Sequence, residues 1–191
     1  TLEQDLLRRD LSINAMAQDV DGEIIDPFDG QGDLQKKVLR HVSAAFAEDP
    51  LRILRVARFH ARFVGLGFSI AAETLELMQQ MVAADELATL ASERVWTEMQ
   101  KALCEPHASQ FFKTLRQIGA LQKILPELDA LFGITQPMRY HPEVDTAIHS
   151  FQVLDIACSL SADSTVRLAA LLHDVGKACS DKASLPHHHG H

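Results

Sequence analysis

Apolar residues recur at helical spacing along most of the chain, and the clearest example lies between residues 49 and 63. One side of this stretch carries Ile53, Val56 and Phe63, whereas the other side carries arginines. Such two-sided patterning is typical of an amphipathic helix packed on a core. Pro50 suits the first turn, where its missing N–H removes no helical hydrogen bond. The pattern therefore predicts a helix over residues 49–63.

The rest of the chain is predicted to be mostly α-helical, with one β-hairpin near the N-terminus. Short apolar runs between Ala15 and Phe28 flank Asp21-Gly22, which we expect to form a two-residue hairpin turn. Residues 1–14 form a polar segment with alternating charges. The apolar spacing predicts further helices over residues 71–82, 92–104, 108–118, 145–160 and 164–174.

Composition supports a helical protein with a substantial core. Hydrophobic residues make up 47% of the 191 residues, but aromatic residues only 6%, so aliphatic packing is expected. No apolar run approaches the roughly 18 residues of a membrane span, and we expect no membrane partner. Cys104, Cys158 and Cys179 are scattered, which favours a reducing compartment over a disulfide scaffold. The expected location is therefore cytoplasmic.

Charge is distributed unevenly along the chain. The formal net charge of −8 argues against a protein that coats nucleic acid. Between Lys36 and Arg62, however, there are seven lysines and arginines and only two acidic residues, Glu48 and Asp49. A local basic surface in an acidic protein is better suited to a confined phosphate-binding site.

A first group of candidate ligand-binding residues lies near the N-terminus. Arg9 follows another arginine, and Asp10 and Asn14 come within the next five positions. Arginine forks bind phosphate oxygens, and a carboxylate or an amide can bind ribose hydroxyls. A solvated, charged turn is the alternative interpretation of these residues.

A second group begins the helix predicted over residues 49–63. Asp49 and Arg52 are three positions apart, so one acceptor and one donor fork would lie side by side. Cytosine and adenine both present an amino donor beside a ring-nitrogen acceptor, unlike guanine and uracil. The pair could therefore select C and A, although an ordinary surface ion pair is the alternative. Arg55 and Arg58 extend the row without nearby acidic partners, which suggests a bound anion.

A third group, near the C-terminus, combines metal-ligand residue types. His173 and Asp174 end an apolar helix, and His149 lies on the helix before it. Imidazole and carboxylate ligands suit a divalent transition metal that activates water. Packing of His149 within a helix interface is the alternative. The histidine run from His187 to His191 could be a purification tag, but Leu185-Pro186 before it is untypical of one.

At this point the sequence resembles the class II nucleotidyltransferases, which comprise CCA-adding enzymes and bacterial poly(A) polymerases. Four segments resemble the second to fifth motifs of that family, in the same order. They are RRDLSINAMA (8–17), DPFDGQGDLQKKVLRHV (26–42), FAEDPLRILRVARF (46–59) and SERVWTEMQKAL (92–103). The C-terminal part, including LPHHHGH (185–191), resembles the HD phosphohydrolase domain of bacterial CCA-adding enzymes.

The resemblance implies three parts: the C-terminal end of an α/β nucleotidyltransferase head (1–43), a helical neck and body (44–140), and the start of an all-α HD domain (141–191). It places Arg9, Asp10, Asn14, Asp49, Arg52, Arg55 and Arg58 in the nucleotide-binding site. It makes His149, His173 and Asp174 metal ligands, with His173 and Asp174 catalytic in HD hydrolysis. Gly32 and Asp33 would lie in a flexible link between head and neck, and Glu93 and Arg94 would support the neck.

The resemblance also implies the activity, the cofactors and the partners. The expected reaction adds C, C and A to tRNA from CTP and ATP, and the HD part would act as a phosphatase and 2′,3′-cyclic phosphodiesterase. The expected metals are Mg²⁺ for transfer and a transition metal such as Ni²⁺ for the HD site.

The family's first motif, a Gly-Gly…Arg-Asp run followed by an Asp-x-Asp pair that holds Mg²⁺, is expected upstream of Thr1. The last HD carboxylate is expected beyond His191. The chain would then be an internal fragment that cannot add nucleotides alone.

Two other functions remain open at this stage. A bacterial poly(A) polymerase shares the second to fifth motifs and would add repeated A without hydrolase activity. Alternatively, an HD metal phosphohydrolase would carry the function, and the N-terminal half would be a degenerate RNA-binding module. The pattern does not indicate an oligomeric state.

Overall fold

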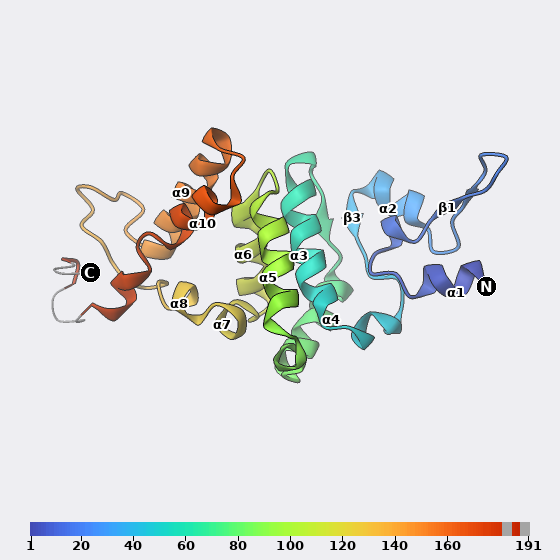
Figure 1. Ribbon diagram of the computed structural model, residues 1–191, viewed down its shortest axis with the longest axis horizontal. Helices are drawn as coiled ribbons and strands as arrows, with labels where there is room; N and C mark the ends of the chain where they lie inside the picture. Colours follow the sequence, from blue (N-terminus) through green and yellow to red (C-terminus); the bar gives the residue numbers. More distant parts are fainter. Residues whose placement is uncertain (181–184, 188–191) are drawn as a thin grey trace.

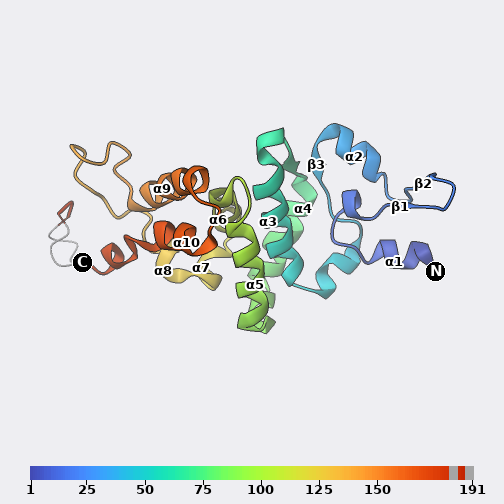
Figure 2. The same cartoon turned by 45° about the horizontal axis from the view of Figure 1, so that its top comes forward.

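The computed structural model describes residues 1–180 and 185–187 of the chain. The N-terminal residues lie at one end of the long axis of the molecule and the last helices, α9 and α10, lie towards the other end (Figures 1 and 2). The fold is mostly helical, as the pattern predicted. The α-helices of the described part are α1 (Leu2–Leu7), α2 (Gly30–Lys36), α3 (Leu51–Phe63), α4 (Ala72–Ala83), α5 (Ser92–Leu103), α6 (Ala108–Gln117), α7 (Leu121–Ile124), α8 (Pro126–Asp129), α9 (Thr146–Leu160) and α10 (Ser164–Leu172).

The predicted N-terminal hairpin is present, but its turn differs from the prediction. Strand β1 (Ala17–Gln18) pairs antiparallel with β2 (Ile24–Ile25). Residues 19–23 connect them, so the two-residue Asp21-Gly22 turn is wrong. Asp19 closes the longer loop, since its Oδ1 accepts from the backbone N–H groups of Asp21 and Glu23 at 2.9 and 2.8 Å.

A second, parallel strand pair connects the N-terminal residues to the helical part. Strand β3 (Val38–Leu39) pairs with β4 (Ser69–Ile70), and α3 lies between them in the sequence. Two-residue strands have no periodicity that a sequence pattern could detect. Helix α1 was missed for a related reason, because a six-residue helix with one buried side chain, Leu6, is too short to show a helical repeat of apolar positions.

The longer predicted helices are confirmed, with ends within two residues of the expected positions. Helix α3 shows why. Asp49 precedes it, and its Oδ1 accepts from the backbone N–H of Leu51 at 3.1 Å. Pro50 occupies the N-terminal cap. After Val64 the chain turns at Gly67, whose φ of 87° favours glycine.

One hydrophobic core extends from the N-terminal residues to the last helices. Helix α3 packs against α5 and α6, and α9 packs against α6 and α10. Phe111 and Phe112 of α6 are fully buried at the centre, and Phe112 stacks near Phe151 of α9. These contacts fix the orientation of α3, which carries Arg52, Arg55 and Arg58, and of α9, which carries His149.

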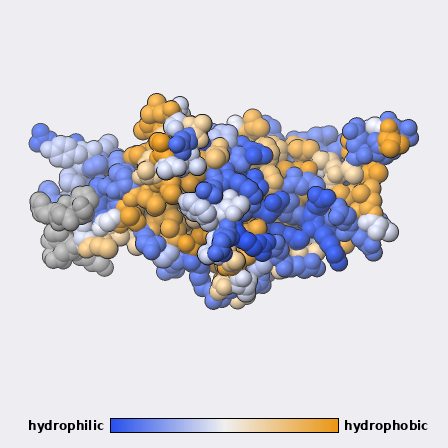
Figure 3. Space-filling model, in the orientation of Figure 1, coloured by the Kyte–Doolittle hydropathy of each residue, from blue (hydrophilic) through white to orange (hydrophobic). Residues whose placement is uncertain are grey.

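Apolar side chains also gather on the outer surface of α9 and α10 (Figure 3). Ile156 and Leu160 are 60% and 80% exposed there. Within the part of the chain that the structure describes, no helix is long and apolar enough to cross a membrane.

Candidate functional sites

Five arginines surround a cavity of about 300 Å³ where the N-terminal segment meets α3 and α5. We call it the arginine cavity, and it is lined by Arg8, Arg9, Asp10, Asp49, Leu51, Arg52, Arg55 and Arg94. The structure therefore brings together two of the predicted groups, although they are about 40 residues apart in the sequence. A concentration of guanidinium groups with two carboxylates is suited to a phosphorylated ligand that also carries hydroxyl or amino groups.

Asp10 lies at the buried edge of this cavity, with only 5% of its surface exposed. Its Oδ1 accepts from the backbone N–H of Leu11 at 2.9 Å and from Asn14 Nδ2 at 3.1 Å. Its Oδ2 accepts from Arg55 Nε at 2.6 Å. A carboxylate has about four acceptor positions, so three bonds leave one for a ligand hydroxyl. Asn14 thus helps to orient the Asp10 carboxylate, whereas its predicted role in the nucleotide site stays a prediction.

Asp49 and Arg52 both line the cavity, but they do not form the i,i+3 ion pair of the alternative interpretation. Asp49 lies before the helix, and its Oδ2 accepts from Arg94 Nη2 at 2.9 Å. Burial opposes ionisation of Asp49. The bonds from Arg94 and from the Leu51 N–H, and the charges of Arg94 and Arg52, outweigh burial and lower its pKa. Asp49 is therefore an ionised acceptor at neutral pH.

Arg52 is held by backbone carbonyl groups from two other segments. Its Nη2 donates to the carbonyl of Arg8 at 2.6 Å, and its Nη1 donates to the carbonyl of Ala45. The guanidinium thus connects the N-terminal segment to the residues that precede α3, at the wall of the arginine cavity.

Arg58 lies elsewhere, and the argument that placed it at an anion site was wrong. Its side chain is buried; Nε donates to Glu98 Oε2 at 2.8 Å and Nη1 to Glu105 Oε1 at 3.4 Å. Arg62 also donates to Glu105, at 2.9 Å. The sequence argument considered only acidic residues close to the arginines in the chain, whereas these partners follow about 40 residues later. Arg58 does not line the arginine cavity.

Two further sequence expectations differ from the structure. Arg94, expected to support the neck, lines the arginine cavity and binds Asp49. Gly32 and Asp33, expected in a flexible link, lie within α2. Asp33 is buried there and accepts from Ser12 Oγ at 2.6 Å and from Arg40 Nε at 3.2 Å. Arg8, which precedes Arg9 in the second motif, is also a lining residue.

The three predicted metal ligands meet where α9 faces the end of α10. His149, His173 and Asp174 each offer a ligand atom, and these atoms lie within 4.8 Å of one another. We call them the His–Asp cluster. His173 Nδ1 lies 2.7 Å from the carbonyl oxygen of Ala170, which can only accept a hydrogen bond. The Nδ1 atom therefore carries the proton, and Nε2 is the nitrogen available to a metal, as is usual for histidine ligands.

Asp174 is buried and ionised within this cluster. Its Oδ2 lies 3.2 Å from His173 Nε2 and accepts from Lys177 Nζ at 2.7 Å. Lys177 also donates to Gln136 Oε1 at 2.6 Å. Burial opposes ionisation, but the Lys177 bond and the charges of His173, Lys177 and His149 lower the pKa of Asp174. Two imidazoles and a carboxylate fit a divalent transition metal.

The sequence missed a second group that shares His149. His141 and Glu143, from the loop before α9, approach His149, and the three ligand atoms also lie within 4.8 Å of one another. We call this group the loop cluster. Part of the predicted C-terminal histidine stretch cannot be placed, since His188, His189 and His191 are outside the described residues.

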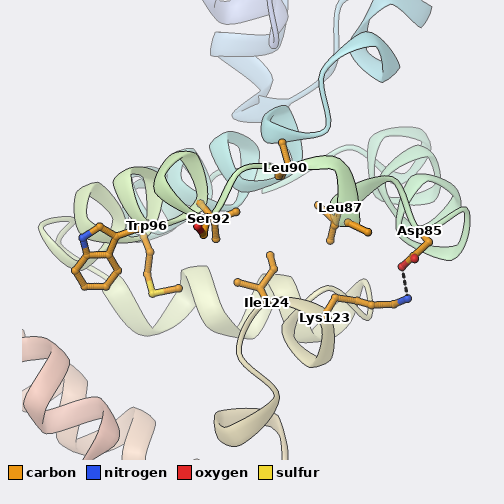
Figure 4. A pocket seen from close by; sticks show the side chains of 10 residues that line it. Asp85, Leu87, Leu90, Ser92, Trp96, Lys123 and Ile124 are labelled. Carbon is orange, nitrogen blue, oxygen red and sulfur yellow. Dashed lines mark hydrogen bonds and ion pairs between the residues drawn. The ribbon is translucent and has the colours of Figure 1, made fainter.

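A separate cavity of about 430 Å³ lies between α5, α7 and the turn η4 (Glu86–Thr89). Leu87, Leu90 and Ile124 line it, and Lys123 bonds Asp85 at its edge (Figure 4). It shares no lining residue with the arginine cavity.

Three family models match successive parts of the chain. The model described as "Poly A polymerase head domain" matches residues 1–40. The model "Probable RNA and SrmB- binding site of polymerase A" matches residues 67–132, which include the lining of the 430 Å³ cavity. The model "HD domain" matches residues 146–191, which include the His–Asp cluster.

Curated relatives decide which proteins the chain resembles as a whole. It is 59% identical over all 191 residues to the multifunctional CCA protein of Thioalkalivibrio sulfidiphilus. It is 58% identical, over the same length, to that of Teredinibacter turnerae. The chain is homologous to multifunctional CCA proteins. It spans about half the length of these relatives, 47% and 46% respectively. The resemblance in the sequence is thus confirmed, whereas the domain limits at residues 43 and 140 stay a prediction.

Solved structures agree with the homology to multifunctional CCA proteins. A CCA-adding enzyme in complex with CTP aligns with a TM-score of 0.70 and 26% identity, covering 95% of this chain and 42% of the other. A tRNA nucleotidyltransferase complexed with a primer tRNA and an incoming ATP analog aligns with a TM-score of 0.67 and 29% identity, covering 91% and 50%. The predicted fold class, a nucleotidyltransferase head with helices and an HD domain, is confirmed.

Proposed function

We propose that the chain is part of a tRNA nucleotidyltransferase that adds C, C and A to the 3′ end of tRNA from CTP and ATP. The homology to multifunctional CCA proteins over all 191 residues carries this proposal. The arginine cavity supports it independently, because it collects the predicted nucleotide-binding residues except Arg58 and Asn14, which bonds Asp10. A poly(A) polymerase is less well supported. The relatives that match all 191 residues at 58–59% identity are named multifunctional CCA protein, whereas polymerase A appears in the descriptions of two domain models.

The arrangement suggests a role for each residue of the cavity. Arg9 and the terminal nitrogens of Arg55 would bind the phosphates of the nucleotide, and Asp10 would accept from a ribose hydroxyl. Asp49 would accept from the amino group of C or A, while Arg52 would donate to the adjacent ring nitrogen. Guanine and uracil present the opposite pattern and would leave both side chains unpaired, which is the basis of strong rejection.

Arg94 gains a role that the sequence did not indicate. Because it holds Asp49 Oδ2 at 2.9 Å, it would keep this carboxylate ionised and oriented as a hydrogen-bond acceptor. Bound Mg²⁺ would stabilise the developing charge of the transferred phosphate. The carboxylates that would hold Mg²⁺ are those of the Asp-x-Asp pair in the family's first motif.

Nucleotide incorporation by the parent protein tests the proposal. Transfer RNA that lacks its 3′ end would be offered with each labelled nucleotide in turn. Incorporation of C and then A, with no further addition, is the expected result. Open-ended addition of A would contradict the proposal in favour of a polymerase. No incorporation at all would leave hydrolysis as the function.

Replacing Asp49 or Arg52 with alanine in the parent protein should relax the choice among nucleotides. Each change removes one half of the donor–acceptor pattern, and a good bidentate pair contributes about 1–3 kcal/mol of discrimination. The expected result is therefore a roughly 5- to 150-fold lower preference for C and A over G and U, measured as the ratio of kcat/KM values. The control is Arg62→Ala on the same helix, outside the cavity. Unchanged selectivity in both variants would refute base recognition by these residues.

A second activity, metal-dependent phosphoester hydrolysis, is favoured by the His–Asp cluster. Two imidazoles and an ionised carboxylate converge there, and the prepared tautomer of His173 fits metal binding. A metal such as Ni²⁺ would activate water for attack on a phosphate ester. Within the chain, His149 and His173 would bind it, and Asp174 would supply the carboxylate. We expect phosphatase and 2′,3′-cyclic phosphodiesterase activity in the parent.

Substitution of His173 separates the two activities. His173→Ala in the parent should abolish hydrolysis of a 2′,3′-cyclic phosphate and leave CTP incorporation unchanged, because the arginine cavity and the His–Asp cluster lie on different helices. If the variant retained full hydrolase activity, the assignment of the cluster would be wrong.

A further inference from the structure

The loop cluster has the geometry of a metal site of its own. Glu143 Oε1 lies 2.6 Å from His149 Nδ1 and 3.4 Å from His141 Nδ1. The two imidazole rings meet edge to face, with centroids 4.6 Å apart. Separations of about 3 Å between ligand atoms are expected around a single ion whose bonds are about 2.0–2.1 Å long. The three atoms therefore need only small adjustments to bind one ion.

The backbone holds the loop firmly against α9. The N–H of Val144 donates to the carbonyl of His141 at 2.9 Å, and the Val144 carbonyl accepts from Gln136 at 2.8 Å. Asp145 then caps α9 by accepting from Ala147 N–H at 2.9 Å. Val144 has a φ of 61°, which is unusual for a β-branched residue. The positions of His141 and Glu143 are therefore determined by the fold.

The three ligand atoms face one another with little access to solvent. The Glu143 side chain is only 10% exposed, and its Oε1 is in contact with His149 Nδ1. His141 Nδ1 is also buried, and it makes no hydrogen bond within the described part of the chain. Most buried polar groups in proteins are hydrogen-bonded, and a cation that receives a lone pair from each of the three atoms would satisfy them together.

We propose that His141, Glu143 and His149 form a second binding site for a divalent transition metal ion, next to the His–Asp cluster. Two imidazoles and one carboxylate form a donor set that suits zinc, iron, cobalt or nickel. Because His149 Nδ1 faces Glu143, only its other nitrogen is left for His173 and Asp174. The loop site therefore binds its ion without His173. The proposal does not depend on the proposed catalytic functions, because metal binding is measured directly.

The test is a titration with Co²⁺, followed by calorimetry and by the visible absorption that reports cobalt coordination. All proteins would carry asparagine at His187, His188, His189 and His191, because these histidines could bind cobalt themselves. In this background, His173→Gln removes a ligand from the His–Asp cluster and leaves the loop site complete. We expect this variant to bind one Co²⁺ per chain.

Adding Glu143→Gln to the His173→Gln protein should weaken Co²⁺ binding by more than about 10-fold, since even outer-shell partners contribute that much. His141→Gln provides an independent second variant. Glu127→Gln, an exposed glutamate on α8, is the matched control and should change nothing. Circular dichroism would verify that each protein is folded.

Two results would overturn the proposal. One is the absence of Co²⁺ binding in the His173→Gln protein, which would assign all binding to the His–Asp cluster. The other is unchanged affinity after both Glu143→Gln and His141→Gln.

Discussion

At the scale of single residues, the burial of an ion pair decides what it contributes. The Asp10–Arg55 pair and the Asp5–Arg9 pair have similar lengths, 2.6 and 2.8 Å. In the first, the Asp10 side chain is 5% exposed; in the second, both side chains are more than half exposed. Solvent screens an exposed pair almost completely, whereas a buried carboxylate that loses its partner is strongly destabilising.

Arg55→Met should therefore lower the free energy of unfolding by about 2 kcal/mol. This is less than the roughly 3–5 kcal/mol of fully buried pairs, because Arg55 is itself 35% exposed and Asp10 keeps two other hydrogen bonds. Arg9→Met, the matched control, should change it by less than about 1 kcal/mol. Urea denaturation measures the free energy of unfolding of both variants. Equal decreases in the two variants would show that the burial of Asp10 does not strengthen its ion pair.

His60 should make the fold less stable as the pH falls below about 6.5. Burial lowers the pKa of His60 from its ordinary value of 6.5, so the unfolded chain binds a proton more readily than the folded one. The stabilisation is complete above the unfolded pKa and is lost as the pH falls towards the folded pKa. We expect His60→Gln to lose less stability than the wild type between pH 7.5 and 5.5. Urea titrations at the two pH values measure the free energy of unfolding of both proteins. If both lost the same amount between pH 7.5 and 5.5, the expectation would be contradicted.

At the scale of elements, α3 has two arginine-bearing faces with different tasks. Arg52 and Arg55 face the arginine cavity, whereas Arg58 turns to Glu98 of α5 and to Glu105. Burial of Glu98 opposes its ionisation, but bonds from Lys101 and Arg58 outweigh this and lower its pKa. Ionised side chains, Arg58 and Glu98, thus join α3 to α5.

Arg58→Met should destabilise the chain by about 2–3 kcal/mol, because two buried glutamates would lose a shared partner. This is less than the roughly 3–5 kcal/mol of an uncompensated buried charge, since Glu98 keeps Lys101 and Glu105 keeps Arg62. Arg62→Met removes a half-exposed arginine that also binds Glu105, and it should cost about 1 kcal/mol or less. Glu98→Gln and Glu105→Gln, added to Arg58→Met, should recover part of the loss. Thermal unfolding measures all three proteins, and a loss below 1 kcal/mol for Arg58→Met would contradict the structural role.

The sequence predicted the longer helices well, because repeated apolar positions report burial directly. It also singled out Asp10, Asp49 and Arg52 within short motifs, and the structure places these three at the arginine cavity; their role in nucleotide binding stays a prediction. It could not predict the partners of Arg58, since these depend on how α3 packs on α5. The hairpin loop and the loop cluster were missed for the same kind of reason: Asp19 and Glu143 act through contacts that only the folded chain creates.

At the scale of the whole molecule, a buried arginine adds hydrogen bonds to the apolar contacts between the central helices and the last two. Arg167 of α10 is buried and donates to the carbonyls of Leu103 and Glu105, at the end of α5, at 2.7 and 3.1 Å. It also donates to the carbonyls of Cys158 and Ser161, at 3.1 and 2.8 Å. The guanidinium group of Arg167 thus donates to carbonyl groups at the C-terminal ends of both α5 and α9, which have no partner within their own helix.

Arg167→Lys should loosen α9 and α10 more than the centre of the molecule. One ammonium group cannot reproduce the fork that reaches both sets of carbonyls, and each buried carbonyl without a donor costs about 1–3 kcal/mol. Hydrogen exchange should accelerate at residues 146–172 and less at residues 51–63. Arg139→Lys, at an exposed position, is the control. Uniform acceleration along the chain would argue against a local junction.

The hold of Arg52 on the carbonyls of Arg8 and Ala45 joins two segments through one side chain at the cavity wall. A guanidinium group has five N–H donors, and these two carbonyls use two of them. Under the proposed function, the remaining N–H groups would serve a nucleobase while the N-terminal segment stays attached to the residues before α3. The side chain that selects the base would then also set the width of the cavity, because it keeps both segments within hydrogen-bond distance of α3.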